Sequence, residues 1–343
     1  VAATVTRQRG VDFEWREGQL ERAQEDATRA LSVALYVDGR YSTHVTHDLD
    51  PERLKAFLGE AVARTRHLQP DPHRQIPDPA LYEGRSKEDL DLVDPQLAEL
   101  DREDREAWCR EMAEAASADE SVISATSQVA DTYGTLARVT SNGFAGTKTT
   151  TAVVLSTAVT IREGDTKRPE DHYFVAGTHR KGLPGPTEVG SMALRRVLER
   201  RGATKIDSTK TTMVVHPEAA AMLFARSIGA LTGGAVQQRR SYLAEKKGQR
   251  IASDVLTVSD DPLMKRALGS RQFDGEGIAA KAMPIIEDGV LSAFYVDTYY
   301  GRKLGWAPTT GSPSNLVFRP GPHDLEGIVA GVEDGILVTS WLG

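Results

Sequence analysis

The chain has 343 residues, enough for two or three domains, and 40% of its residues are apolar, which supplies ample material for buried cores. A net charge of −7 disfavours general nucleic-acid binding, because contact with phosphates needs a basic face, and no apolar run is long enough to span a membrane. The single cysteine, Cys109, excludes an internal disulfide and fits a reducing compartment. We therefore expect a cytoplasmic protein without nucleic-acid or membrane partners.

The first 95 residues predict an antiparallel sheet, a covering helix and a linker. Alternating apolar residues predict strands at 1–6, 11–15, 31–37 and 41–45. Asp38-Gly39 is a strong hairpin signal between the last two strands. A helix is predicted from Asp50 to about Val62, and the stretch from Pro70 to Pro95 is too polar and proline-rich for a core. We place the boundary of an N-terminal domain, 1–95, at the end of this stretch.

The middle region, 96–205, repeats the combination of sheet and helix. A charged helix is predicted over 101–116, with Cys109 on its buried side and its acids and arginines in solvent. A second antiparallel sheet follows, with strands predicted at 122–132, 135–141, 149–161 and 172–177. Turns are predicted at Tyr133-Gly134 and Asn142-Gly143, and Thr187 is the predicted cap of a helix that runs to Leu198.

The C-terminal region, 206–343, begins with a short apolar strand that leads into a helix. The strand covers 211–215, the helix begins at Pro217, its apolar residues recur at helical spacing to Leu231, and Gly233-Gly234 ends it. An apolar helix of this kind is expected in a core. Further strands are predicted at 251–258, 283–286 and 290–296, and 309–315 is predicted to be a loop. The whole pattern predicts an α+β fold with predominantly antiparallel sheets and covering helices.

Both ends of the chain suggest a fragment. The sequence does not begin with Met, and it stops directly after a strand-like run that starts at Ile336. We expect the C-terminal domain to be truncated.

A search for self-contained catalytic motifs finds little. There is no Gly-x-Ser-x-Gly motif, and Gly146-Thr147-Lys148-Thr149 lacks the frame of a phosphate loop and is predicted to be a strand end. Four acids could in principle share a cation, but aspartates beside glycines also serve turns for backbone reasons, which is the favoured interpretation. These acids are Asp260, Asp261, Asp274 and Glu276.

Several blocks in the C-terminal region, taken in order, resemble the PmbA/TldE branch of the TldD/PmbA family, also called the modulator of DNA gyrase family. The blocks are Phe273-Asp274-Gly275-Glu276-Gly277, Asp288-Gly289-Val290-Leu291, Tyr299-Tyr300-Gly301-Arg302-Lys303-Leu304-Gly305 and Thr309-Thr310-Gly311. The resemblance extends over essentially the whole chain. It implies an α+β fold with N-terminal, middle and C-terminal regions, and relatives that continue beyond the point where this chain stops.

The resemblance also implies that this chain does not bind zinc. TldD-type members resemble zinc proteases and carry His-Glu-x-x-x-His on the helix after the strand. Here Ala225 and Ala230 stand at the two histidine positions, and Arg226 stands at the glutamate position. A methyl group cannot ligate a metal, and a guanidinium cannot accept a proton from water. We therefore expect no metal or other cofactor in this chain.

PmbA/TldE proteins pair with a TldD-type subunit, which is expected to hold the zinc. Together they cleave small or unfolded peptides and mature modified ones, so the resemblance implies a hetero-oligomer, with a homodimer also possible. We expect the turn of Phe273, Asp274, Gly275, Glu276 and Gly277 to line a substrate cavity, with Tyr299 and Arg302 near it. An equally good interpretation is that these residues only shape and fill a tight hairpin.

Two other classes of function stay open from the sequence. One is an interaction or regulatory protein without a protease role, linked to gyrase or to a toxin–antitoxin system as the family name suggests. The other is an independent enzyme with a metal site built from scattered histidines and aspartates.

Overall fold

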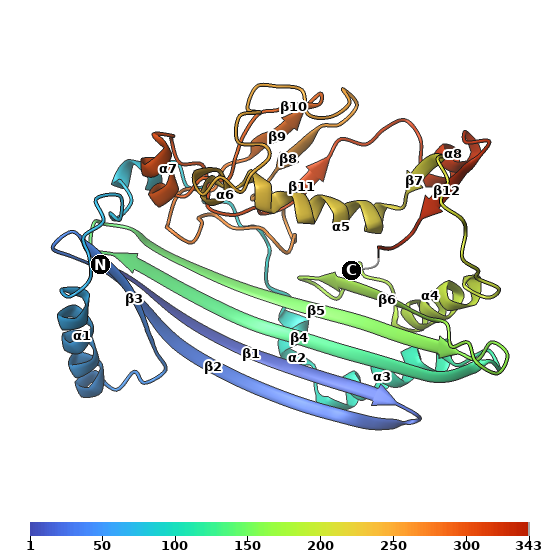
Figure 1. The fold of residues 1–343 in the computed structure, drawn as a ribbon. Coiled ribbons are helices and arrows are strands. Elements are labelled where there is room, and N and C mark those ends of the chain that lie inside the picture. The colour runs from blue at the N-terminus through green and yellow to red at the C-terminus, as the bar shows by residue number, and fades with distance from the viewer. Residues whose placement is uncertain (342–343) are drawn as a thin grey trace. The chain divides into compact units, whose positions relative to one another are not determined.

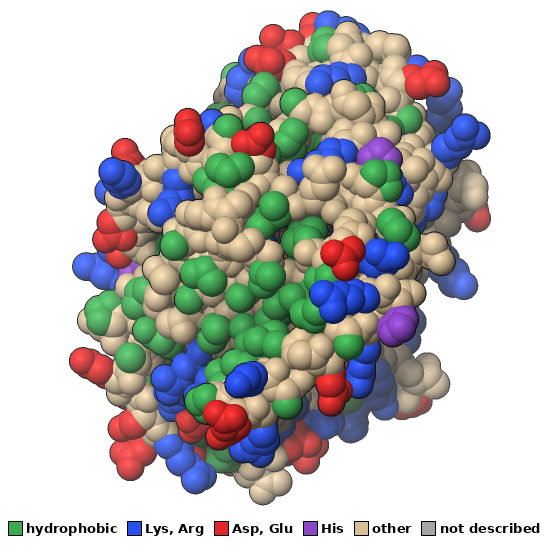
Figure 2. All heavy atoms as spheres, turned by 90° about the vertical axis from the view of Figure 1, so that its left-hand side faces the viewer, with side chains coloured by type: hydrophobic (Ala, Val, Ile, Leu, Met, Phe, Trp, Pro, Cys, Tyr) green, Lys and Arg blue, Asp and Glu red, His purple; other side chains and the backbone are tan. Residues whose placement is uncertain are grey.

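The computed structural model describes residues 1–341, and the chain divides into two compact units (Figure 1). Unit 1 contains residues 1–70, 88–204 and 264–270, and unit 2 contains residues 71–87, 205–263 and 271–343. None of the helices within residues 1–341 combines the length and the apolar character that crossing a bilayer requires. On the face shown in Figure 2, basic and acidic side chains are interspersed around a stretch of hydrophobic ones.

One long antiparallel sheet forms the centre of unit 1. Its strand order is β3-β2-β1-β4-β5-β6, so β1 lies between β2 and β4 (Figure 1). The strands are β1 (Ala2–Arg16), β2 (Gln19–Val37), β3 (Arg40–Thr46), β4 (Val122–Thr140), β5 (Ala145–Ile161) and β6 (Glu170–Gly177). The prediction of two separate sheets is therefore wrong. It is wrong because both edges of β1 are used, one by its hairpin partner and one by a strand more than 100 residues later.

The turns of this sheet follow the predicted chemistry at two of three places. Asp38 and Gly39 both have positive φ, 50° and 73°, as a two-residue hairpin requires, and Gly143 has a φ of 105°. The predicted turn at Tyr133-Gly134 is wrong, because β4 continues through it and Gly134 pairs with Gln8 on one side and Thr150 on the other.

Helices cover one face of the sheet at two separate places. At one end α1 (Pro51–Thr65) packs on Leu31, Val33 and Leu35. At the other, α3 (Arg102–Ala116) and α4 (Pro186–Glu199) pack against β1, β4 and β5, with the short α2 (Pro95–Glu99) nearby in the chain. The larger core contains Val11, Phe13, Cys109, Met112, Val129, Leu155 and Val189. Helix α4 begins after Gly185, so Thr187 is not its cap, because Pro186 already occupies the first turn.

The predicted bounds of helix α3 and the predicted burial of Cys109 are confirmed. The prediction that all its acidic and basic side chains face solvent is wrong. The Cys109 thiol is fully buried, and burial raises its pKa to about 12, as expected for an inert core thiol. Arg105, however, is only 2% exposed and forms a two-pronged ion pair with Asp131 of β4, at 2.6 and 3.0 Å. The helix therefore brings one cation into the core together with its counterion.

The proline-rich stretch is more than a linker. Residues 71–87 belong to unit 2, whereas residues 88–94 belong to unit 1, where Leu90 and Leu92 are buried. The region boundary predicted after residue 95 does not coincide with a boundary between the compact units. The boundary predicted after residue 205 lies one residue from the boundary between Thr204 and Lys205.

Unit 2 contains a four-stranded antiparallel sheet and a two-stranded parallel one. The first has the order β10-β9-β8-β11 and the second pairs β12 with β7. Its strands are β7 (Thr212–Val215), β8 (Val258–Asp260), β9 (Met283–Glu287), β10 (Val290–Leu291), β11 (Leu316–Phe318) and β12 (Gly335–Val338). Its helices are η1 (Pro79–Tyr82), α5 (Pro217–Ile228), η2 (Gly229–Leu231), α6 (Gly233–Gln237), α7 (Thr298–Leu304) and α8 (Leu325–Ala330). The strand predicted at 251–258 is irregular over residues 251–257, and only its last residue, Val258, belongs to β8.

Candidate functional site

Strand β7 and helix α5 form the predicted strand–helix unit of the C-terminal region. A ring nitrogen of His216 accepts a hydrogen bond from the backbone N–H of Glu218, and Pro217 occupies the first helical position. The helix ends earlier than predicted, at Ile228. Gly233 and Gly234 begin α6 instead of ending α5, and a Cβ at either position would lie within 3.2 Å of Tyr300. These glycines therefore allow α6 to approach α7 closely.

The expectation that α5 lies in a core is wrong for most of its surface. Of its twelve residues only Ala219 is buried, and Met222 and Leu223 are 45% and 49% exposed. The helix packs through one narrow stripe, in which Phe224 meets Phe318 edge to face at 5.0 Å and Ile228 contacts the core of unit 2. Apolar spacing alone therefore overstated how much of this helix is covered.

The three positions that correspond to the zinc motif offer no metal ligand. Ala225 and Arg226 lie on the exposed part of α5, and Ala230 lies in the following 3₁₀ turn, η2. Within residues 1–341 no group of three or more His, Cys, Asp or Glu side chains is placed to hold a metal ion. Two methyl groups and a guanidinium therefore do not fit a zinc ion at these positions.

The Phe273–Gly277 segment is a tight turn closed by its own aspartate. One oxygen of Asp274 accepts hydrogen bonds from the backbone N–H groups of Glu276 and Ile278, at 2.9 and 3.0 Å. Phe273 is buried and pairs with Ala279, and Gly277 has a φ of 91°, which favours glycine. Asp274 therefore has the backbone role that the sequence favoured over cation binding.

Glu276 connects this turn to helix α7. Its two carboxylate oxygens accept from the backbone N–H and the hydroxyl of Thr298, at 2.8 and 2.6 Å, at the first residue of the helix. An acid at a helix N-terminus is electrostatically favourable. Burial nevertheless raises the pKa of Glu276 above its ordinary value.

We expect Glu276→Ala to destabilise unit 2 by about 2 kcal/mol, because it leaves buried donors of Thr298 unsatisfied. Glu276→Gln should cost less, since an amide can still pair with both groups.

The raised pKa of Glu276 in the folded state also makes stability depend on pH. The protonated carboxyl stabilises the folded state at low pH, and this contribution is lost as pH rises through the folded-state pKa. The wild type should therefore lose stability relative to Glu276→Gln as pH rises above about 4. Urea denaturation measured across pH tests this, with Glu287→Gln, a change at an exposed acid, as the control. Parallel curves of unfolding free energy against pH for the wild type, Glu276→Gln and Glu287→Gln would contradict it.

Tyr299 and Arg302 of α7 bind the stretch 71–76. The Tyr299 hydroxyl donates to Asp71 at 2.9 Å, and the Arg74 guanidinium lies 3.5 Å from the centre of the Tyr299 ring. Arg302 donates to the backbone carbonyls of His73, Gln75 and Ile76. These two predicted site residues therefore hold the proline-rich stretch onto α7 within unit 2.

The polar loop 309–315 is organised by two charged residues that the sequence did not single out together. The Arg271 guanidinium donates to the carbonyls of Pro313 and Ser312 and to the Thr310 hydroxyl. Asp260 is 2% exposed and accepts from the Tyr295 hydroxyl and from both the backbone and the hydroxyl of Ser314. Asp260 was noted only as a possible cation ligand. It lies beyond the end of the predicted strand at 251–258, so the sequence pattern did not indicate that it is buried.

A cavity of about 260 Å³ lies beside this loop, within unit 2. It combines the polar groups of Asp260, Arg271 and Thr310 with apolar wall residues. The apolar part includes Leu81, Pro262, Ile278, Ala279, Ala280 and Met283. The residues on either side of the Phe273–Gly277 turn line this cavity, whereas the turn itself does not. An apolar cavity with a few fixed polar groups is the usual form of a site for a small ligand or a side chain.

Comparison with known proteins shows where this architecture occurs. The PmbA/TldA metallopeptidase central domain matches residues 95–201, and the PmbA/TldA metallopeptidase C-terminal domain matches residues 208–343. Metalloprotease PmbA of Escherichia coli O157:H7 is 27% identical over 350 residues, which cover 99% of this chain and 75% of that protein.

Two crystal structures resemble the chain over its full length. A Bacteroides thetaiotaomicron protein, named as a candidate modulator of DNA gyrase, is 37% identical with a TM-score of 0.96 and is covered to 78% of its length. TldE from Thermococcus kodakarensis is 22% identical with a TM-score of 0.81 and is covered to 79%, which shows a shared fold. The α+β fold predicted from the sequence is confirmed by these structures. Because the two domain models together match most of the chain, it belongs to the PmbA/TldD metallopeptidase family.

Proposed function

We propose that this chain is the subunit of a TldD/TldE-type metalloprotease that does not bind zinc, and that it works with a zinc-bearing TldD-type partner on small or unfolded peptides. The observation that carries the proposal is the chemistry of α5 and the turn after it. Ala225, Arg226 and Ala230 offer two methyl groups and a permanent cation, whereas activating water on a metal needs imidazole and carboxylate groups. Membership of a metallopeptidase family makes peptides the natural substrate class.

In this proposal the chain contributes to holding the peptide, while the partner supplies the hydrolytic centre. The cavity lined by Leu81, Arg271 and Ile278 is the candidate surface in unit 2. Its apolar walls suit a side chain, and its fixed polar groups suit the backbone of an extended peptide. The Phe273–Gly277 turn has a supporting role, because its internal hydrogen bonds fix the two flanks that line the cavity.

The experiment is to purify the chain alone and mixed with a TldD-type partner, and to measure zinc content and cleavage of an unstructured peptide. We expect substoichiometric zinc and no cleavage by the chain alone, with cleavage in the mixture. Replacing the glutamate of the partner's His-Glu-x-x-x-His motif by Gln should abolish cleavage by the mixture. Arg226→Ala in this chain should leave the rate within about twofold, because an exposed surface substitution has little effect and Arg226 has no part in the chemistry proposed here.

Two outcomes would contradict the proposal. Stoichiometric zinc in this chain alone would favour an independent metalloenzyme. Inactivity with every TldD-type partner, when those partners are themselves folded and zinc-loaded, would favour an interaction protein without a protease role.

A further inference from the structure

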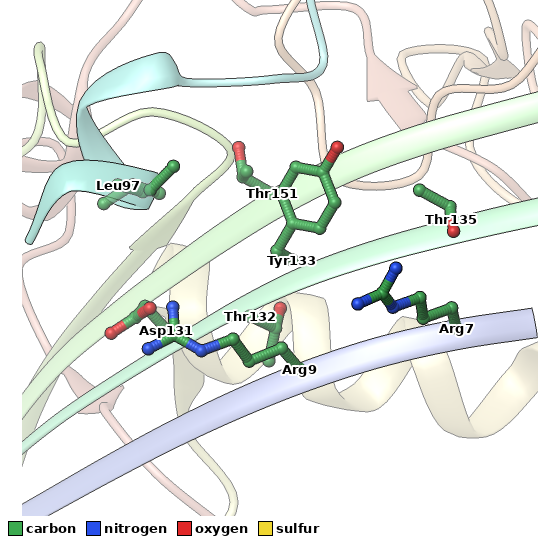
Figure 3. A pocket seen from close by; sticks show the side chains of 9 residues that line it. Arg7, Arg9, Leu97, Asp131, Thr132, Tyr133, Thr135 and Thr151 are labelled. Carbon is green, nitrogen blue, oxygen red and sulfur yellow. The ribbon is translucent and has the colours of Figure 1, made fainter. Parts of the chain in front are cut away.

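A second cavity, of about 380 Å³, lies on the helix-covered face of the long sheet in unit 1 (Figure 3). It is lined by Arg7 and Arg9 of β1, by Tyr133 and Thr135 of β4, and by Leu97 and Ala98 of α2, among others. Figure 3 shows Arg7 projecting from β1 toward the space between Tyr133 and Thr135, while Arg9 projects toward Asp131. This volume is within the range of small-ligand sites.

The strand register places unneutralised positive charge at this cavity. Arg7 lies directly opposite Arg29 of β2 and directly opposite Thr135 of β4. Within residues 1–341 neither the Arg7 nor the Arg29 side chain has an ion-pair partner. Like charges facing each other across two strands are destabilising, so this pair costs stability unless an anion joins it.

The other charges at the cavity are already matched. Arg9 pairs with Glu25 at 2.7 Å, and both carboxylate oxygens of Asp131 accept from Arg105. Arg7 therefore supplies the cavity's available guanidinium. The hydroxyls of Tyr133 and Thr135, which line the same cavity, have no hydrogen-bond partner within residues 1–341. A cavity that offers a guanidinium and two hydroxyl donors is suited to a carboxylate, which only accepts hydrogen bonds when ionised.

The remaining wall is apolar. Leu97 is buried, and together with Ala98 and the ring of Tyr133 it supplies the apolar lining of the cavity. We propose that this cavity binds a peptide carboxylate that has an apolar side chain next to it. The carboxylate can be the C-terminus or an acidic side chain. The site lies in unit 1, and the inference does not depend on the proposed protease role.

The test is binding of labelled pentapeptides to the full chain, measured by fluorescence anisotropy. The peptides contain glycine and alanine and end in leucine, as the free acid, as the neutral amide, and as the amide with one alanine replaced by glutamate. We expect the free acid, the glutamate peptide or both to bind about tenfold or more tightly than the neutral amide, because a charged hydrogen bond is lost with the amide. Which of the two binds identifies the source of the carboxylate.

Arg7→Gln should abolish this preference, whereas Arg64→Gln should keep it. Arg64 is exposed on α1, so the two variants have the same net charge. Because Arg7 faces Arg29, Arg7→Gln should not lower the melting temperature, which separates lost binding from lost folding. Equal affinity for all three peptides, no saturable binding by any of them, or an Arg7→Gln variant that behaves like Arg64→Gln would overturn the inference.

Discussion

Gly190→Ala is expected to destabilise unit 1 by about 3 kcal/mol or more, because the added methyl group meets backbone atoms that cannot rotate away. Gly190 is a buried residue of α4, and a Cβ there would lie 2.1 Å from the carbonyl oxygen of Met112 and 3.0 Å from the Ala115 side chain, both on α3. The two helices would have to separate, and Met112 and Val189, which are fully buried between them and the sheet, would lose contacts.

Gly59→Ala is the matched control for this change. Gly59 is also a helical glycine, on α1, but a Cβ there has nothing within 4 Å, so alanine should stabilise by about 0.5–1 kcal/mol through helix propensity. Hydrogen exchange of the α3 and α4 amides measures the effect locally, which matters because a two-unit chain need not unfold in one step. Unchanged protection of these amides in Gly190→Ala would show that the helices are packed less closely than described.

Arg105→Ala should destabilise unit 1 by about 3–5 kcal/mol, the cost of leaving a buried carboxylate without its counterion. The side chains of Arg105 and Asp131 are 3% and 7% exposed, so water cannot replace the lost partner. Arg105 also donates to the carbonyls of Leu100 and Asp101, at the start of its own helix, and these bonds would be lost as well.

Two further variants isolate the cause of that loss. Arg102→Ala removes an arginine one turn earlier on the same helix. Its side chain is 70% exposed in the pair with Glu106, so the change should cost at most about 0.5 kcal/mol. The double variant Arg105→Leu/Asp131→Leu should recover most of the stability, because removing both charges leaves none unpaired. Urea denaturation compares the four proteins. A double variant as unstable as Arg105→Ala would show that packing, and not the unpaired charge, causes the loss.

Local signals predicted the local structure well. The hairpin at Asp38-Gly39, the start of α1, the bounds of α3 and the turn at Asp288-Gly289 follow from residues that are adjacent in the chain. In each case the physical cause is short-range: positive φ at the turn residues, or a side-chain cap at the helix start. The strand predicted at 290–296 is wrong beyond its start, because β10 ends at Leu291.

The errors concern contacts between distant parts of the chain. Nothing near β1 indicates that β4 will pair with its free edge, so two predicted sheets are one. A charged helix gives no sign that one arginine turns inward. Asp131 offered a signal, because it shares its inward side of β4 with Ala125, Ser127 and Val129, and an acid in such a series needs a buried partner.

In the candidate site too, local structure could be predicted from the sequence, whereas contacts between distant segments could not. The resemblance singled out the Phe273–Gly277 turn, but glycine and aspartate spacing cannot distinguish a cavity wall from a tight turn beside one. The interactions of Tyr299 and Arg302 with residues 71–76 join segments more than 200 residues apart, so sequence spacing gave no access to them. The family motifs singled out these residues as candidates, and the structure shows which groups they contact.

The central place of β1 also affects how the chain reaches its native state. The ribosome releases β1, β2 and β3 as an early three-stranded piece whose outer edge, on β1, stays unpaired until β4 has emerged more than 100 residues later. An unpaired edge of this length can capture another nascent chain. Translation pauses between residues 46 and 122 should therefore lower the yield of native protein in the cell more than pauses placed after residue 177.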